Sequence, residues 1–138
     1  MKELRELELE EAKLRQKYEF YVYTEKIEFF EFIKYLTQIL NEVGEERTSV
    51  GLPMRLSLNV NNGVPELKFW NGYTMKVVTY NSNSNDKEFI ETVILHWREC
   101  KDEMEEETKK MARYYLNEKK KRLQKNIGKM KKVLEGGL

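Results

Sequence analysis

The two prolines of this 138-residue chain, Pro53 and Pro65, both lie in its middle third. Proline removes a backbone hydrogen-bond donor and interrupts helices, so its confinement to the centre leaves both ends able to form long helices. Lysine, glutamate and leucine dominate those ends, and all three favour helix formation. The distribution therefore predicts helical ends around a non-helical centre, within a single domain that spans residues 1–138.

Apolar residues at helical spacing predict that residues 2–43 are helical. The first part, residues 2–18, carries a thin apolar stripe that cannot hold a helix alone in water, so it requires a partner. That stripe consists of Leu4, Leu7, Leu14 and Tyr18. The segment FYVYT at 20–24 is rich in β-prone residues and ends in a potential helix cap, which favours a break there; one continuous helix is the alternative. Gly44 is expected to end the helical region.

In the central third, apolar and polar residues alternate, which is the pattern of half-buried strands. The stretch 45–53 is expected to be a loop. A three-stranded antiparallel meander is predicted after it, with strands at about 54–60, 65–70 and 73–80. Asn71-Gly72 favours a type I′ turn between the last two strands, because these residue types tolerate the positive φ angles that this turn needs.

The same alternation assigns residues to the two faces of the predicted sheet. It predicts that the inward face of the last strand consists of Tyr73, Met75 and Val77. If helices cover one face alone, the other face is expected to expose Trp70, Val78 and Tyr80. An exposed apolar patch usually marks an interface, so these three residues are candidate contacts for a protein partner.

Residues 86–135 are predicted to form one long helix after a polar loop at 81–86, with Asn85 as its N-cap. The apolar series of this helix changes phase after Tyr115, which indicates a bend or a change in what the helix packs against. The second series supplies candidate interface residues, namely Leu116, Leu123, Ile127 and Met130. So much apolar helix surface exceeds what a small sheet can cover, and a homodimer or larger assembly through the helices is expected.

Charge is distributed unevenly between the two helical regions. Residues 1–47 hold eight basic and twelve acidic side chains, whereas residues 109–132 hold eleven basic and one acidic. An antiparallel arrangement of the two regions would place the acidic start of the chain beside its basic end. The predicted fold is therefore α+β, with long antiparallel N- and C-terminal helices joined by a three-stranded meander.

The basic segment also permits a second interpretation, in which it contacts nucleic-acid phosphates. The candidate contacts are Lys119, Lys120, Lys121, Arg122, Lys125 and Lys129. No aromatic residue interleaves with them, and an acidic partner exists in the same chain. Pairing within the chain is therefore the favoured interpretation of this segment.

Chemistry-bearing residues are few. His96 and Cys100 are four residues apart, as two metal ligands or a Cys/His pair would be, but the sequence has no second histidine or cysteine. A buried thiol beside a histidine is the simpler interpretation. No nucleophile, metal-binding or phosphate-binding motif occurs, so no catalytic, cofactor or metal site and no enzymatic activity are expected.

These observations favour a small non-catalytic interaction protein: an adaptor, assembly factor or inhibitor that acts through its long helices or its exposed sheet face. The alternative is a nucleic-acid-binding protein that uses residues 109–132. A single cysteine, a charged N-terminus without an apolar core and no apolar run of membrane length predict a cytoplasmic protein that does not bind membranes.

Overall fold

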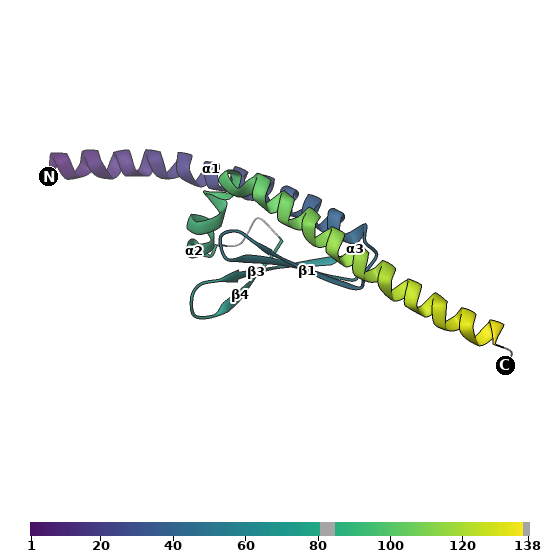
Figure 1. The fold of residues 1–138 in the computed structure, drawn as a ribbon. Helices are drawn as coiled ribbons and strands as arrows, with labels where there is room; N and C mark the ends of the chain where they lie inside the picture. Colours follow the sequence, from purple (N-terminus) through teal and green to yellow (C-terminus); the bar gives the residue numbers. More distant parts are fainter. Residues whose placement is uncertain (81–84, 137–138) are drawn as a thin grey trace.

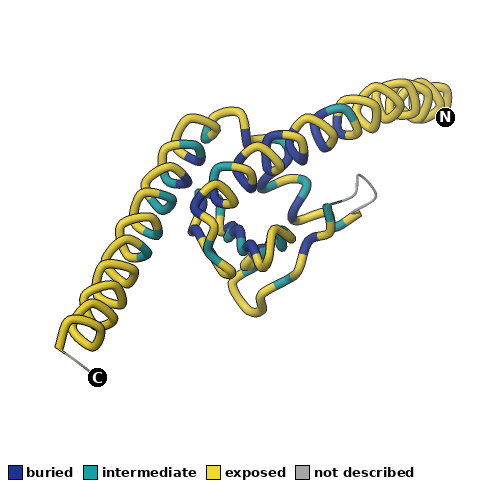
Figure 2. The backbone as a smooth tube through the Cα atoms, turned by 90° about the vertical axis from the view of Figure 1, so that its right-hand side faces the viewer, coloured by how far each residue is buried: buried dark blue, intermediate teal, exposed yellow. Residues whose placement is uncertain are grey.

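A computed structural model of the chain describes residues 1–80 and 85–136 (Figure 1). Helix α1 (Lys2–Asn41) leads into a four-stranded antiparallel sheet, and the long helix α3 (Trp97–Glu135) follows the sheet. The predicted α+β architecture is confirmed. Helices cover one face of the sheet, and the apolar core lies between them (Figure 2).

Helix α1 is continuous through residues 20–24, so the predicted break is wrong and the alternative of a single helix holds. The hydroxyl of Thr24 does not cap a helix start, because its Oγ1 donates to the carbonyl oxygen of Phe20 at 3.0 Å within the same helix. Burial of the C-terminal half of α1 against the rest of the protein outweighs the β propensity of this segment. Gly44, with a φ of 70°, turns the chain away after the helix ends.

The sheet has the strand order β1-β2-β3-β4, with strands β1 (Arg47–Leu52), β2 (Leu56–Asn61), β3 (Val64–Trp70) and β4 (Met75–Val78). The predicted meander is therefore present but has one strand more than expected. Strand β1 occupies the stretch 45–53, where the sequence favours a loop. Its residues alternate like those of the other strands, with Thr48, Val50 and Leu52 buried, but Gly51 and the nearby proline obscure that signal.

The tight turn with two positive φ angles lies between β2 and β3, at Asn62 and Gly63, where φ is 50° and 83°. At Asn71-Gly72 the type I′ prediction is wrong: Gly72 has a φ of 97°, but Asn71 is not in the positive region. Instead, Oδ1 of Asn71 accepts hydrogen bonds from the backbone N–H groups of Tyr73 and Thr74. This side chain therefore holds a longer loop in place, as asparagine often does in turns.

The strand pairing across this loop decides which residues of β4 face the core. Leu67 of β3 pairs with Val78, and Trp70 pairs with Met75. A two-residue turn would pair Trp70 with Tyr73 and give the same faces, because the shift to Met75 is two residues. Because paired residues share a face, Val78 lies on the covered face and is buried, whereas Tyr73, Met75 and Val77 are exposed. The predicted inward face of this strand is therefore wrong, and so is the predicted exposure of Val78.

Tyr80 is a further correction, since it is half-buried rather than exposed. Its ring packs against Phe30, with 5.7 Å between the ring centroids, and its hydroxyl oxygen lies 3.3 Å from Oγ1 of Thr37. Burial disfavours the charged phenolate and raises the pKa of Tyr80 to about 12. Tyr80 therefore belongs to the packing between the sheet and α1 rather than to an outer surface.

The predicted helix at 86–135 is interrupted near its start. A short helix α2 (Lys87–Phe89) and a π-helical turn η1 (Ile90–Ile94) precede α3. Asp86 rather than Asn85 is the N-cap, since its Oδ1 accepts from the backbone N–H of Phe89 at 3.0 Å. The turn buries Val93 and Ile94 in the core, and such turns shift the face that a helix presents. Most of the predicted polar loop, residues 81–84, lies outside the described residues.

Helices α1 and α3 run in the same direction, so the predicted antiparallel arrangement is wrong (Figure 1). Glu25 contacts the start of α3 at Arg98, and Val43, just beyond the end of α1, accepts a hydrogen bond from Lys119. Residue numbers thus rise together along both helices. The reason is that α2 and η1 carry the chain back to the middle of α1 before α3 begins. The acidic start and the basic end of the chain consequently lie at opposite ends of the molecule.

The change of apolar phase after Tyr115 marks the point where α3 leaves the core. Met104 and Thr108 are fully buried, whereas Leu116 is exposed. Of the two predicted causes, a bend or a change in what the helix packs against, the second therefore fits. Tyr115 itself lies against edge strand β1: its hydroxyl accepts from the backbone N–H of Ser49 at 3.0 Å and lies 3.3 Å from the carbonyl oxygen of Ser49.

Replacing Tyr115 by phenylalanine is expected to lower the free energy of unfolding by about 1 kcal/mol, because backbone groups of the β1 edge lose their partner. Hydrogen exchange should show faster exchange of the Ser49 amide. Tyr114→Phe is the control, since Tyr114 is an exposed tyrosine that adjoins Tyr115 on the same helix. Unchanged exchange at Ser49 in the Tyr115 variant would show that the hydroxyl does not protect this edge.

Candidate interaction surfaces

The first half of α1 projects from the core as a free helix, here called the N arm (residues 2–21). Every residue of the N arm is exposed, and the first buried residue of α1 is Val22 (Figure 2). The exposed stripe predicted from the sequence continues along it at spacings of three, four and seven. Its members are Leu4, Leu7, Leu14, Tyr18 and Tyr21. Glu11 occupies the position that would complete a coiled-coil series.

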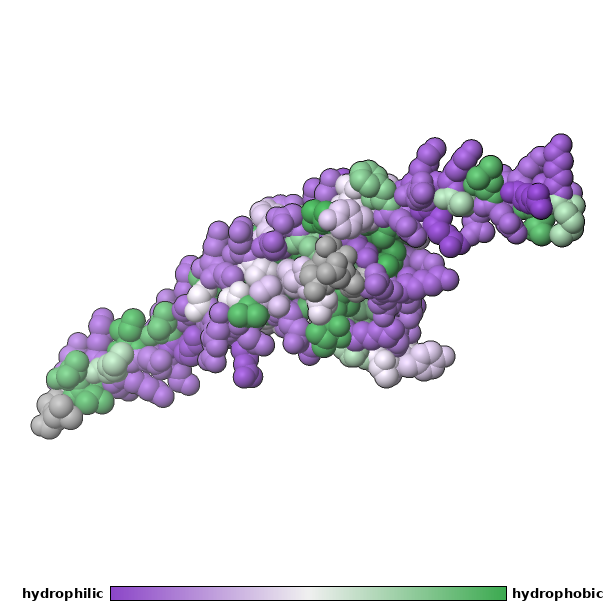
Figure 3. All heavy atoms as spheres, turned by 180° about the vertical axis from the view of Figure 1, so that it is seen from behind, coloured by the Kyte–Doolittle hydropathy of each residue, from purple (hydrophilic) through white to green (hydrophobic). Residues whose placement is uncertain are grey.

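The second half of α3 forms an equivalent projection at the opposite end, the C arm (residues 116–135). Its exposed apolar series contains the predicted interface residues and one more, namely Leu116, Leu123, Ile127, Met130 and Leu134. Lys120 fills the one position that this series lacks. Apolar side chains are visible on both arms in the space-filling view (Figure 3). The structure thus places the predicted residues on one side of a helix, and their role in an interface stays a prediction.

Of the six basic residues that were predicted to contact nucleic acid, three bind other groups of the same chain. Nζ of Lys119 donates to the carbonyl oxygens of Val43 and Gly44 at 3.2 and 2.9 Å, just beyond the end of α1. A cation there also complements the helix dipole. Two others have ion pairs: Arg122 with Glu45 at 2.8 Å, and Lys121 with Glu118. Within the described part of the chain, no ion pair is present for Lys120, Lys125 and Lys129.

A polar contact joins α1 to the start of α3, between the two arms. The carboxylate of Glu25 is nearly buried and accepts from Nε1 of Trp97 at 2.9 Å and from Nε of Arg98 at 2.9 Å. Arg98 also pairs with Glu28. These hydrogen bonds, chiefly that from Arg98, lower the pKa of Glu25 and keep it charged. Sequence reasoning missed this contact, because nothing local distinguishes Glu25 from the other glutamates of α1.

The outer face of the sheet carries a smaller apolar patch at the β3–β4 edge. Of the three residues predicted there, Trp70 alone is exposed, with 42% of its surface accessible. The patch is completed by Tyr73, Met75 and Val77. The sequence alone could have identified these residues, if they had been assigned to the sheet face of Trp70 rather than to that of Phe69. Elsewhere this face carries Arg47, Ser49, Asn59 and Lys68, so the patch does not extend across the sheet.

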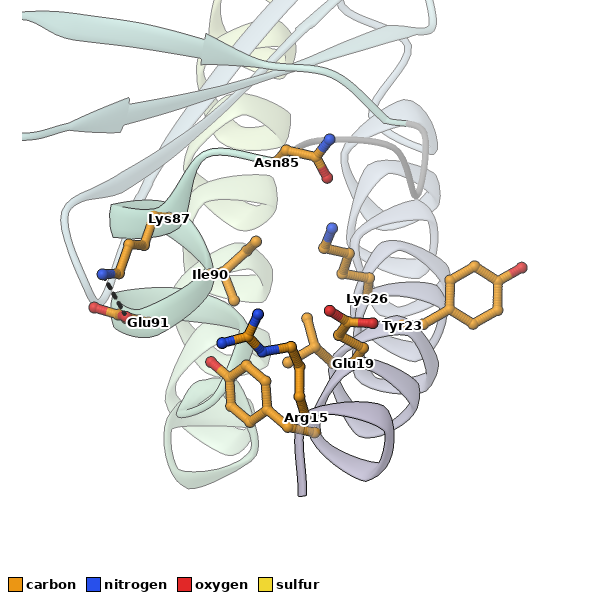
Figure 4. A pocket seen from close by; sticks show the side chains of 10 residues that line it. Arg15, Glu19, Tyr23, Lys26, Asn85, Lys87, Ile90 and Glu91 are labelled. Atoms are coloured by element: carbon orange, nitrogen blue, oxygen red, sulfur yellow. Dashed lines mark ion pairs between the residues drawn. The ribbon is translucent and has the colours of Figure 1, made fainter. Parts of the chain in front are cut away.

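A cleft of about 890 Å³ lies at the root of the N arm, between α1 and the α2–η1 segment (Figure 4). Charged groups of both signs line it, including Arg15, Glu19, Lys87 and Glu91. Lys87 and Glu91 form an ion pair across 3.9 Å. Burial lowers the pKa of a further lining residue, Lys26. Because the charges largely balance, the cleft does not select a ligand of one charge.

The His96–Cys100 pair does not form a site. His96 is half-exposed at the start of α3, with its Nδ1 3.8 Å from the carboxylate of Glu99, while Cys100 packs partly buried against the core. Within residues 1–80 and 85–136, no cluster of three or more acidic, histidine or cysteine side chains could hold a metal ion.

No helix in the described part of the chain is long and apolar enough to cross a membrane. Comparisons of the chain with protein-family models, with curated proteins and with solved structures give no match.

Proposed function

We propose that this chain is a non-catalytic protein-interaction module, acting as an adaptor, assembly factor or inhibitor, whose two arms bind protein. The observation that carries this proposal is that the N arm and the C arm each expose an apolar stripe with coiled-coil spacing. Isolated helices of this length are marginal in water, and contiguous exposed apolar surface commonly marks an interaction site.

The core between the arms supports this function by acting as a rigid spacer. Aromatic side chains from three helical segments interlock in it: Phe29 of α1 contacts Phe89 of α2 and Trp97 of α3, with ring centroids 6.1 and 5.9 Å apart. The contact of Glu25 with Arg98 adds a directional constraint. Partners bound to the two arms would therefore be held at a fixed separation and orientation.

Photo-crosslinking in the native host tests the proposal. A photoreactive amino acid at Leu14 or Ile127, on the two stripes, is expected to crosslink efficiently to protein. The same amino acid at Gln16 or Lys125, on the opposite sides of the arms, is expected to give several-fold less product. No protein crosslinks from the stripes, or equal crosslinking from both sides, would overturn the proposal.

Nucleic-acid binding is a second candidate function, which one observation favours. The basic C arm projects away from the N arm and its acidic tip, so the tip does not neutralise the lysines of the C arm (Figure 1). In this case, replacing Lys120, Lys125 and Lys129 by glutamine should abolish binding to random duplex DNA. Removal of each phosphate-binding lysine should also flatten the dependence of log K on log salt by roughly one unit. Absence of binding at low salt would exclude this function.

A further inference from the structure

The protein exposes more surface than a compact chain of its mass. Its accessible area is 9973 Å² at 16.7 kDa, whereas a compact monomer of that mass exposes roughly 7,600 Å². The excess of about 2,400 Å² is of the size that a stable protein interface buries. The arms contribute to this excess, since they project from the core at both ends (Figure 1).

We infer that the partner of each arm is a second copy of this chain, with the N arm of one copy packed along the C arm of another. This inference rests on the proposed function, because it names the occupant of the same stripes. The two arms match in length at 20 residues each, which is about 30 Å of helix. Both present six positions in a coiled-coil series, of which five are apolar or aromatic.

Charge favours the pairing of an N arm with a C arm over the pairing of two N arms or of two C arms. Residues 3–11 of the N arm hold five glutamates and one arginine, whereas residues 119–132 of the C arm hold eight basic residues and no acidic residue. The one charged residue in each coiled-coil series also differs in sign: it is Glu11 in the N arm and Lys120 in the C arm. Pairing two C arms would bring the two basic segments together, and pairing two N arms in parallel would bring their acidic tips together, whereas the mixed pair joins opposite charges.

The N arm and the C arm of one chain cannot pair with each other, because of the directions of α1 and α3. Because α1 and α3 run in the same direction, the N arm leaves one end of the core and the C arm leaves the other (Figure 1). The acidic tip of an N arm can therefore reach a basic C arm only in a different copy. The contact is heterologous, since each copy contributes a different surface to it.

Complementation between two full-length variants tests the inference. The first variant carries Leu7→Gln and Leu14→Gln in the N arm, and the second carries Leu123→Gln and Ile127→Gln in the C arm. Glutamine preserves helix propensity, and all four residues are exposed in the single chain, so both variants should fold. Leu9→Gln is the matched control, because Leu9 has the same 58% exposure as Leu7 but lies off the stripe.

Analytical ultracentrifugation at about 1–100 μM, a range set by typical micromolar affinities, should show that the wild type and the control self-associate. Each double variant alone should associate on the order of 100-fold more weakly, since burying one leucine contributes roughly a tenfold effect. An equimolar mixture of the two variants should form a 1:1 complex, because each retains the arm that the other lacks.

Three outcomes would overturn the inference: a wild-type monomer throughout this range, self-association of either double variant alone as strong as that of the wild type, or no complex in the mixture. The first outcome, together with stripe-specific crosslinks to a different protein, would leave the proposed function intact and reject only the second copy as partner. Absence of any protein crosslink would reject both.

Discussion

Replacing Phe29 by alanine is expected to lower the free energy of unfolding by about 3–5 kcal/mol, as large-to-small substitutions of buried aromatic residues do. Phe29 is fully buried, and its ring meets those of Phe30, Phe89 and Trp97 edge-on. The substitution leaves a cavity where α1, α2 and α3 converge, and the surrounding rings cannot collapse into it without giving up their own packing. Equilibrium denaturation in guanidinium chloride, followed by tryptophan fluorescence, measures the loss.

Phe20→Ala provides the matched control on the same helix. Phe20 is 72% exposed, so its removal is expected to change the free energy of unfolding by less than about 0.5 kcal/mol. A comparable loss in both variants would mean that the effect at Phe29 arises from helix propensity or the unfolded state rather than from core packing.

Replacing Glu25 by alanine is expected to lower the free energy of unfolding by about 2–3 kcal/mol, because the indole N–H of buried Trp97 then has no acceptor. The wild-type contribution should also depend on pH. The pKa of Glu25 is lowered from its usual 4.5 in the folded protein. Its stabilisation is therefore complete above that value and is lost as the pH falls through the folded-state pKa.

Denaturation curves from about pH 3 to about pH 7, a range that spans the usual carboxyl pKa, check this dependence with Glu25→Gln as the comparison. Glutamine keeps an acceptor for Trp97 but cannot ionise, so stability of that variant should fall less steeply in acid than that of the wild type. Glu31→Gln is the surface control: Glu31 is exposed and pairs with the exposed Lys34, so a loss of about 0–1 kcal/mol is expected. Equal acid slopes in all three proteins would contradict a special role for Glu25.

Features set by neighbouring residues were predictable from the sequence. The helical ends, the meander and the two apolar stripes follow from residue spacing, and the structure contains all of them. The errors have two origins. The predicted face of β4 is in the wrong phase, since pairing with Trp70 across either turn places Met75 on the outer face. The interruption before Trp97 depends on burying Val93 and Ile94, and it is decided by contacts between elements, which residue spacing does not encode.

The sequence by itself determined that both ends of this chain are amphipathic helices with opposite charge at their tips, because periodicity and charge are local properties. Tertiary structure alone decided that those ends point apart. The direction of α3 depends on the return of the chain through α2 and η1, which is held by packing of Phe89 against Phe29 and Phe69. That packing converts a charge match that looked intramolecular into one that only a second molecule can satisfy.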